Sequence, residues 1–185
     1  MKVGLISDTH GDATAWRRAV GIFESCELIL HAGDHLYHGA FNLILPTYDP
    51  KELTREINEC PIPILHARGN CDSEVDQSAL NDPIMSPYAF CRLEGVNVMI
   101  THGDAMDEME LVDLARGYRA NLLVRGHTHS HGIWEHGPML VCNPGSPSIP
   151  KGDGVPSVGI LEDGVVSLYD MRDGSITASR SLPKG

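Results

Sequence analysis

Short apolar runs recur along the first two thirds of the chain, and each has the length of a β-strand. They occupy residues 3–6, 28–30, 62–65, 96–100 and 122–124. Their hydrophobicity is continuous rather than alternating, which is typical of strands that are buried on both faces. The pattern therefore predicts a sheet that is covered on both sides.

Two segments between these runs carry the three- and four-residue spacing of an amphipathic helix. Asp12 or Thr14 can cap the first segment, and the second follows Asp107. Their apolar positions are Trp16, Ala19, Val20 and Phe23 in the first segment and Leu111, Leu114, Ala115 and Tyr118 in the second. Because strands and helices alternate, the chain is predicted to be of the α/β class.

After residue 130 the chain changes to short segments separated by turn signals. Asp163-Gly164 lies between the strand-like segments 158–161 and 165–169, and Asp173-Gly174 follows them. These signals predict terminal antiparallel strands, which either extend the first sheet or form a second sheet packed on it. The Gly-, Pro- and Ser-rich stretch 144–156 is short enough to be a loop, so we expect one domain over residues 1–185.

Each of the five predicted strands is followed by a polar cluster. The clusters occupy residues 7–11, 31–34, 68–72, 101–104 and 126–129. In open α/β sheets, ligands bind in the crevice beyond the carboxyl ends of the strands. We therefore expect the five loops to converge on one site.

The clusters contain seven side chains that can bind a divalent metal ion. They are Asp8, His10, Asp34, Asn70, His102, His127 and His129. If the chain is extended, residues two apart point to the same side, so Asp8 pairs with His10 and His127 with His129. Carboxylate, imidazole and carboxamide donors suit Mn, Fe or Zn, and seven donors exceed the needs of one site. Two metal ions that share a carboxylate would support hydrolysis of a phosphate ester.

The order and spacing of these residues resemble the calcineurin-like metallophosphoesterase superfamily. The matching motifs are Asp8-Thr9-His10, Gly33-Asp34, Gly69-Asn70, His102-Gly103 and Gly126-His127-Thr128-His129. The resemblance spans roughly residues 1–150, and five ordered motifs are far more specific than one. The segments around His38-Gly39, 68–76 and 143–152 are similar to a subfamily of small bacterial phosphodiesterases of the YfcE type.

The resemblance implies two packed mixed β-sheets flanked by helices, an α/β/β/α sandwich. It also implies two divalent metal ions per chain, with manganese expected first and iron, zinc or nickel as alternatives. One ion would be held by Asp8, His10, Asp34 and His129, and the other by Asp34, Asn70, His102 and His127. Asp34 would bridge the ions, and a hydroxide between them would attack the phosphodiester.

Cys71 departs from the superfamily pattern, in which a histidine often follows Gly-Asn and assists the leaving group. A thiol is a poorer cation and a different acid, so activated diesters are favoured over phosphoprotein monoesters. We expect catalytic roles for Asp34, Asn70 and Cys71, and substrate contacts from His38, Asn70 and Cys71. The role of Asp72 is left open.

Net charge and cysteine usage limit the binding partners and the cellular compartment that we expect. The formal net charge is −11 and the chain has no basic run, which argues against nucleic-acid binding. Two bound cations would nevertheless make the site locally positive, so a small anionic phosphodiester fits. Five scattered cysteines without a CxxC pair, and no apolar run of signal-peptide or membrane length, predict a cytoplasmic protein that does not enter a membrane.

Plainer interpretations stay open beside this one. The candidate ligands can be turn and capping residues. The six histidines outside the ligand set, His31, His35, His38, His66, His131 and His136, are most simply loop or partly buried residues. A retromer subunit with the same fold and a degraded site works as a scaffold, and a phosphomonoester, a dinucleoside polyphosphate or DNA ends are alternative substrates. The subfamily also suggests a homo-oligomer, a dimer or tetramer, in which the apolar residues of segment 37–45 would form a contact patch or cover the site.

Overall fold

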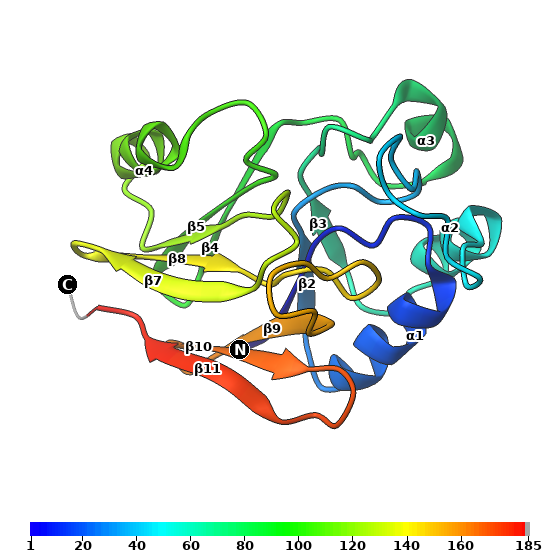
Figure 1. Cartoon of the computed structure of the whole chain (residues 1–185). Helices are drawn as coiled ribbons and strands as arrows, with labels where there is room; N and C mark the ends of the chain where they lie inside the picture. The colour runs from blue at the N-terminus through cyan, green and yellow to red at the C-terminus, as the bar shows by residue number, and fades with distance from the viewer. Residues whose placement is uncertain (184–185) are drawn as a thin grey trace.

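The computed structural model describes residues 1–183, which form two mixed β-sheets with helices on their outer faces (Figure 1). The first sheet has the strand order β11-β10-β9-β1-β2-β3 and the second β4-β5-β6-β8-β7. The first sheet consists of β1 (Lys2–Ile6), β2 (Leu28–His31), β3 (Ile64–His66), β9 (Ser157–Glu162), β10 (Val165–Asp170) and β11 (Ile176–Ser181). The second consists of β4 (Tyr88–Leu93), β5 (Val96–Thr101), β6 (Leu122–Val124), β7 (Gly132–His136) and β8 (Met139–Asn143).

Parallel strands form one half of the first sheet and the centre of the second, and antiparallel strands complete both. β1, β2 and β3 are parallel, as are β5, β6 and β8, while β9 pairs antiparallel with β1. The terminal hairpin strands extend the first sheet, which decides between the two arrangements that the sequence left open. Asp163 and Gly164 both have positive φ, as a tight hairpin turn requires.

A continuous apolar core lies between the two sheets. Val98 and Ile100 of β5 point into this core with Leu5 of β1, while Met99 points to the opposite face of the second sheet. Each of these strands is therefore buried on both sides, which explains why its hydrophobicity is continuous.

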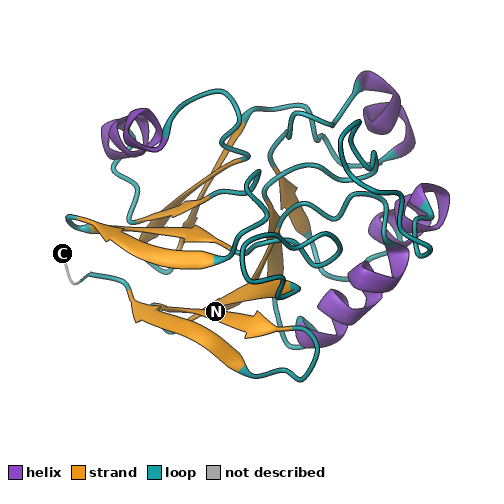
Figure 2. Ribbon diagram, viewed as in Figure 1, coloured by secondary structure: helices purple, strands orange, loops and turns teal. Residues whose placement is uncertain are grey.

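The helices cover the outer faces of the sheets (Figure 2). α1 (Ala13–Ile22) and α2 (Pro50–Asn58) pack on the first sheet through a core that includes Trp16, Phe23 and Leu53. α4 (Glu108–Gly117) packs on the second sheet through Leu111 and Val112. The fourth helix is the short α3 (Glu74–Ala79). The order of layers is that of an α/β/β/α sandwich.

The two predicted helices begin where their caps indicated. Of the two candidates for α1, Asp12 is the N-cap, and its side chain accepts from the backbone N–H of Ala15. Asp107 caps α4 in a reciprocal arrangement with Glu110. These caps satisfy backbone donors that a helix start would otherwise leave unpaired.

Several elements were not predicted from the sequence. They are α2, α3, β4, β7 and β8. β7 contains Glu135 and His136, which lack an apolar pattern because this strand lies at the edge of the second sheet. Within residues 1–183, no helix combines the length and apolar character that crossing a bilayer requires.

Candidate metal centre

The loops that follow β1, β2, β3, β5 and β6 bring the seven predicted ligands together. We call these side chains the donor cluster: Asp8, His10, Asp34, Asn70, His102, His127 and His129. Parallel strands end at the same edge of their sheet, so each sheet delivers its loops to one place. Because the two sheets are packed face to face, the two sets of loops meet.

One part of the donor cluster surrounds the carboxylate of Asp8. Its Oδ1 lies 3.2 Å from Nε2 of His129 and 3.7 Å from Nε2 of His10. The two Nε2 atoms are themselves 3.2 Å apart. All three side chains are buried. Three potential ligands thus face one point, as the ligands of a metal ion do.

The other part surrounds Asn70 and the carboxylate of Asp34. Asn70 Oδ1 lies 2.8 Å from Nδ1 of His127 and 3.2 Å from Nε2 of His102. Nε2 of His102 also lies 3.3 Å from Oδ2 of Asp34, and that same oxygen is 3.6 Å from Nε2 of His10. Asp34 therefore lies between the two parts of the cluster.

Three histidines of the cluster are oriented in the same way. Nδ1 of His10 contacts the backbone carbonyl of Tyr37 at 2.7 Å, and Nδ1 of His129 contacts that of Ile149 at 2.7 Å. Nδ1 of His102 contacts the carbonyl of Ala32 at 2.8 Å. A carbonyl only accepts, so Nδ1 carries a proton, and Nε2, which faces the carboxylates, is the nitrogen that can bind a metal ion once it is unprotonated. Metal-binding histidines are commonly held in this way.

The resulting electrostatics favour a cation. Asp8 Oδ1 is buried and has no hydrogen-bond donor within the described residues. Leaving a buried carboxylate oxygen uncompensated is costly, and a bound cation would compensate it. Burial disfavours a charged His102, but Asp34 and Asp8 outweigh it and raise the pKa of His102 to about 9. The pKa of His10 is raised for the same reason. The residues present therefore fit a divalent cation in charge, donor type and orientation.

The backbone of the ligand loops is not extended, so one premise of the sequence argument was wrong. Asp8, His10, Asp34, His127 and His129 all have positive φ, between 43° and 71°. The side chains of Asp8 and His10 nevertheless approach each other because the chain turns sharply, not because it alternates. Such backbone strain is concentrated at functional sites.

Glycines allow these loops to pack closely. A Cβ on Gly69 would lie 2.1 Å from Oδ1 of Asp34, and one on Gly126 would lie 1.9 Å from Oγ of Ser7. Neither position has room for a side chain. The glycines of the motifs are therefore required by contacts between loops that are distant in sequence.

Cys71 and His38 occupy different surroundings. The Cys71 backbone N–H donates to Oδ1 of Asp34 at 2.8 Å, and its side chain lines the cavity over the cluster. Burial, and then the charge of Asp34, raises the pKa of the Cys71 thiol to about 12. The His38 ring packs edge-on against Tyr37 and Tyr48 and is not among the residues that line the cavity. Its contact with substrate stays a prediction.

Several residues around the site were missed by sequence reasoning. Hydroxyl groups of Ser146 and Ser148 donate to the backbone carbonyl of Asp8, at 2.7 and 3.0 Å. A cavity of about 530 Å³ opens over the cluster, and Lys151 is among its lining residues. Tyr37 and Phe41, from the segment that was expected to form a contact patch or cover the site, line it as well. The Gly-, Pro- and Ser-rich stretch 144–156 was the available signal, because a loop of that composition is often functional.

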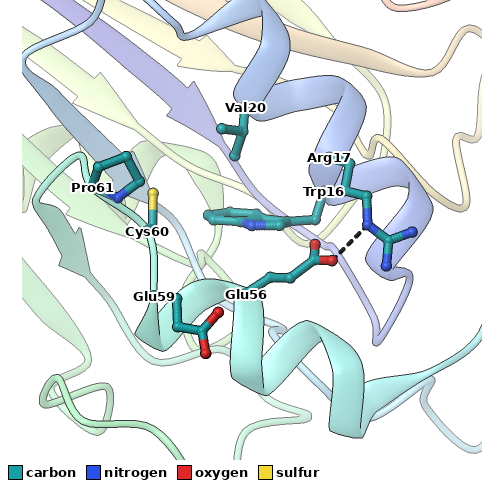
Figure 3. Close-up of a pocket in the computed structure, with 7 residues that line it drawn as sticks. All are labelled: Trp16, Arg17, Val20, Glu56, Glu59, Cys60 and Pro61. Carbon is teal, nitrogen blue, oxygen red and sulfur yellow. Dashed lines mark hydrogen bonds and ion pairs between the residues drawn. The ribbon is translucent and has the colours of Figure 1, made fainter.

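A second hollow lies between α1 and α2 and shares no lining residue with the site (Figure 3). Trp16 and Glu56 face each other there, and Arg17 Nε donates to Glu56 Oε1 at 2.5 Å. Oε2 of Glu56 has no hydrogen-bond partner, and no ligand cluster of the described residues includes the residues of this hollow.

The fold and the donor cluster together define a metal-dependent phosphoesterase. Residues 1–163 match the calcineurin-like phosphoesterase superfamily domain, and the chain belongs to that family. The expectation from the five ordered motifs is thereby confirmed.

Relatives of known name narrow the comparison. The chain is 36% identical to phosphodiesterase YfcE of Escherichia coli K12 over 184 residues, covering 98% of both proteins. The solved structure of the E. coli YfcE phosphoesterase superposes with a TM-score of 0.86 over 98% of this chain and 100% of that one. Vacuolar protein sorting 29 of Cryptosporidium parvum shares the fold, with a TM-score of 0.72 at 21% identity over 99% of this chain and 98% of that one.

Proposed function

We propose that this protein is a phosphodiesterase that uses two divalent metal ions, with Asp34 between them. The observation that carries the proposal is the donor cluster, in which the Nε2 atoms of three histidines face two carboxylates, one with an unpaired oxygen. Likeness to E. coli YfcE supports the choice of a diester. The bound ions would activate water near neutral pH and stabilise charge on the phosphoryl oxygens.

The ligand sets follow from the two parts of the cluster. Asp8, His10 and His129 would hold one ion and Asn70, His102 and His127 the other, with Asp34 shared. The backbone carbonyls bound to Nδ1 fix the rings in place, so little reorganisation is needed when the ions bind. Mixed nitrogen and oxygen donors without a thiolate suit manganese, with iron, zinc or nickel as alternatives.

Asn70 and Cys71 would act on the substrate side. The Asn70 Nδ2 group is 3.3 Å from the Cys71 sulfur, and both residues line the cavity. With a pKa of about 12, the thiol is neutral and too weak an acid to protonate a poor leaving group efficiently. We infer that the enzyme hydrolyses diesters whose leaving group departs without strong protonation.

The cavity supports a small substrate. Its volume of about 530 Å³ admits a nucleotide-sized molecule. Lys151 is the one Lys or Arg side chain among its lining residues. It would attract an anionic substrate in a chain that otherwise repels one. A small phosphodiester fits this cavity better than a nucleic-acid duplex.

The proposal is tested by Asp8→Ala and His127→Ala, assayed on an aryl phosphodiester with manganese added. We expect both variants to lose hydrolysis while retaining the wild-type circular dichroism spectrum. His136→Ala is the matched control, because His136 bonds Glu108 away from the cluster. Full turnover in both variants, or activity that survives exhaustive chelation, would refute the mechanism.

A substrate panel with manganese addresses specificity. Cyclic nucleotides, nucleoside diesters, dinucleoside polyphosphates, phosphomonoesters and DNA ends would be compared by kcat/KM. We expect activated diesters to lead. Metal analysis of the purified protein separates an enzyme from a scaffold, because an inert chain without metal would favour the scaffold.

The proposal also covers domain organisation, cellular location and self-association. We propose one domain, because the core between the sheets joins both halves of the chain. The five free cysteines are compatible with a cytoplasmic location. Self-association stays a prediction, with exposed Phe41, Leu43 and Ile44 as its contact surface. A monodisperse monomer in light scattering at high concentration would contradict it.

A further inference from the structure

Three histidines outside the donor cluster lie together at the ends of β2 and β3. This histidine stack consists of His31, His35 and His66, and all three side chains are buried. The rings of His31 and His35 are stacked, with centroids 3.9 Å apart and an interplanar angle of 20°. The ring of His66 lies 5.0 Å from that of His35. Three buried imidazoles are costly unless each polar atom has a partner.

Asp72 connects the stack to two ligand loops. Its Oδ2 accepts the backbone N–H of Asp34 at 3.0 Å and that of Gly69 at 2.7 Å. Its Oδ1 accepts the backbone N–H of His35 at 2.7 Å. One buried carboxylate thus ties the loop that carries Asp34 to the loop that carries Asn70. The same bonds hold the pKa of Asp72 below its usual range despite burial, mainly through His35.

The imidazoles continue this network outward. Nδ1 of His35 lies 2.9 Å from Asp72 Oδ2, and because an ionised carboxylate only accepts, Nδ1 carries the proton. Nε2 of His35 in turn lies 2.9 Å from Nδ1 of His66. Burial, and then His35, lowers the pKa of His66 to about 3, so that His66 is neutral. The chain of contacts runs from His66 through His35 to Asp72.

His31 contacts the loop after β1, which is the third ligand loop in contact with the stack. Its Nδ1 accepts the backbone N–H of Gly33 at 3.2 Å, which leaves the proton on Nε2. Nε2 lies 3.2 Å from Oγ1 of Thr9, and that hydroxyl donates to the carbonyl of His35 at 2.9 Å. Thr9 stands between Asp8 and His10 in the chain. The stack is therefore bonded to the loops after β1, β2 and β3.

These bonds argue against a third metal site in the stack. Both nitrogens of His31 and both nitrogens of His35 are taken by partners within the protein. Nε2 of His66 is buried without a hydrogen-bond partner and lies 3.7 Å from Oδ2 of Asp82. One unpaired nitrogen does not make a metal site, and no ligand group within residues 1–183 includes these histidines.

We propose that the histidine stack and Asp72 form a positioning network that holds Asp34 and Asn70 at their ligand positions before a cation binds. The inference rests on the proposed metal-dependent function for its consequence, but the network itself belongs to the metal-free protein. Outer partners of this kind commonly change metal affinity 10–100-fold when removed.

The test compares His35→Leu with His35→Asn. Leucine fills a similar volume but removes the bond to Asp72, whereas the asparagine amide reaches the position of Nδ1 and retains a donor. Manganese binding measured by calorimetry is expected to weaken about 10–100-fold in His35→Leu and to recover in His35→Asn. Leu168→Ala, a buried change in β10, controls for lost stability alone and is expected to bind manganese like the wild type.

A metal-free readout keeps the proposal testable if the function is wrong. Amide hydrogen exchange at Asp34 and Gly69 reports the bonds to Asp72 directly, and it is expected to accelerate in His35→Leu but not in Leu168→Ala. If His35→Leu does not fold, His66→Leu removes the outer bond and is expected to give the same changes at smaller size. Unchanged exchange at both amides in a folded variant, or wild-type manganese affinity, would overturn the proposal. If the wild-type protein does not hydrolyse diesters but the exchange results are as expected, only the proposed function is overturned.

Discussion

The histidines of the donor cluster and those of the histidine stack share one chain and one neighbourhood, yet their nitrogens are used differently. In the cluster, Nδ1 of His10, His102 and His129 donates to a backbone carbonyl and Nε2 faces a carboxylate. In the stack, both nitrogens of His31 and His35 have partners within the protein. Within residues 1–183, the stack leaves only Nε2 of His66 without a partner. The difference teaches that a candidate metal site is recognised by several nitrogens that converge on the same carboxylates, not by residue type or burial.

The two regions also differ in charge. The cluster favours a positive charge, because Asp34 and Asp8 raise the pKa of His102 to about 9. The stack disfavours one, because burial lowers the pKa of His66 to about 3 and that of His31 well below its usual value. The cluster therefore attracts positive charge, whereas His31 and His66 of the stack are neutral near pH 7.

The largest expected effect is that of removing a ligand. His129→Ala takes away the nearest of the three imidazoles that face Asp8 Oδ1, and manganese binding should be lost at that position. We expect hydrolysis of an aryl diester to fall at least about 10³-fold, because several kcal/mol of charge stabilisation are lost and each 1.4 kcal/mol is tenfold. The rate with added manganese checks this. A variant within tenfold of the wild type would remove His129 from the ligand set.

Displacing a ligand without removing it should have the next largest effect. In Gly69→Ala the new methyl group would meet Asp34 Oδ1 at 2.1 Å, so that the carboxylate must move. We expect activity to fall about 100-fold, as misplacement by 1 Å typically costs. Gly21→Ala is the matched control, since a Cβ there meets nothing within 4 Å. That change lies in α1 and should stabilise the protein by up to about 1 kcal/mol.

Metal affinity should rise with pH. In the metal-free protein His102, with a pKa of about 9, is protonated at neutral pH, and the proton must leave before Nε2 can bind an ion. Between pH 6.5 and 9 the affinity should therefore increase, by up to about tenfold per pH unit for each proton released. Calorimetric titration with manganese in buffers of different ionisation enthalpy measures that release. An affinity independent of pH would contradict the protonation of His102 in the metal-free protein.

The stability of the metal-free protein should depend on pH in opposite directions for the two regions. The raised pKa of His102 contributes stability that is present below its unfolded pKa and lost as pH rises toward 9. The lowered pKa of His66 contributes stability that is present above pH 6.5 and lost as pH falls toward 3. Each group can change the slope by about 1.4 kcal/mol per pH unit at most.

Chemical denaturation across this range should show greatest stability near pH 6.5. The acidic side should flatten in His66→Leu, because that variant has no imidazole to protonate on unfolding. If the acid limb stays unchanged in a folded His66→Leu variant, His66 does not carry the acid sensitivity.

The smallest expected effect lies at the cavity mouth. Phe41 lines the cavity and is fully exposed, and it contacts neither region of histidines through a hydrogen bond. Phe41→Ser should change KM for an aryl diester by a few fold and leave kcat and manganese affinity unaltered. A loss of kcat would show instead that the segment around Phe41 shapes the donor cluster.

Local pattern was sufficient for much of the fold. The five apolar runs correspond to β1, β2, β3, β5 and β6, although β3 begins two residues later than its run. Caps at Asp12 and Asp107 placed two helices. The edge strand β7 could not be found this way, because its pairing with β8 comes from the rest of the sheet and not from its own composition.

The sequence identified candidate ligands that the structure does bring together, but the reason given for their proximity was wrong. Asp8 and His10 lie close together, yet both have positive φ, so spacing on an extended chain was the wrong explanation. His31, His35 and His66 were treated as residues of no special role, because nothing in their local sequence shows that Asp72 lies among them. Their partners come from other loops.

The sequence by itself determined the class of fold, the donor types and the family, because periodicity and ordered motifs are local properties of the chain. Only the tertiary structure decided which nitrogen of each histidine is free, which carboxylate oxygen is unpaired and how the terminal hairpins are placed. Those properties depend on hydrogen bonds between loops that are as far apart as Asp8 and Ser148, and such bonds exist only once the two sheets have packed.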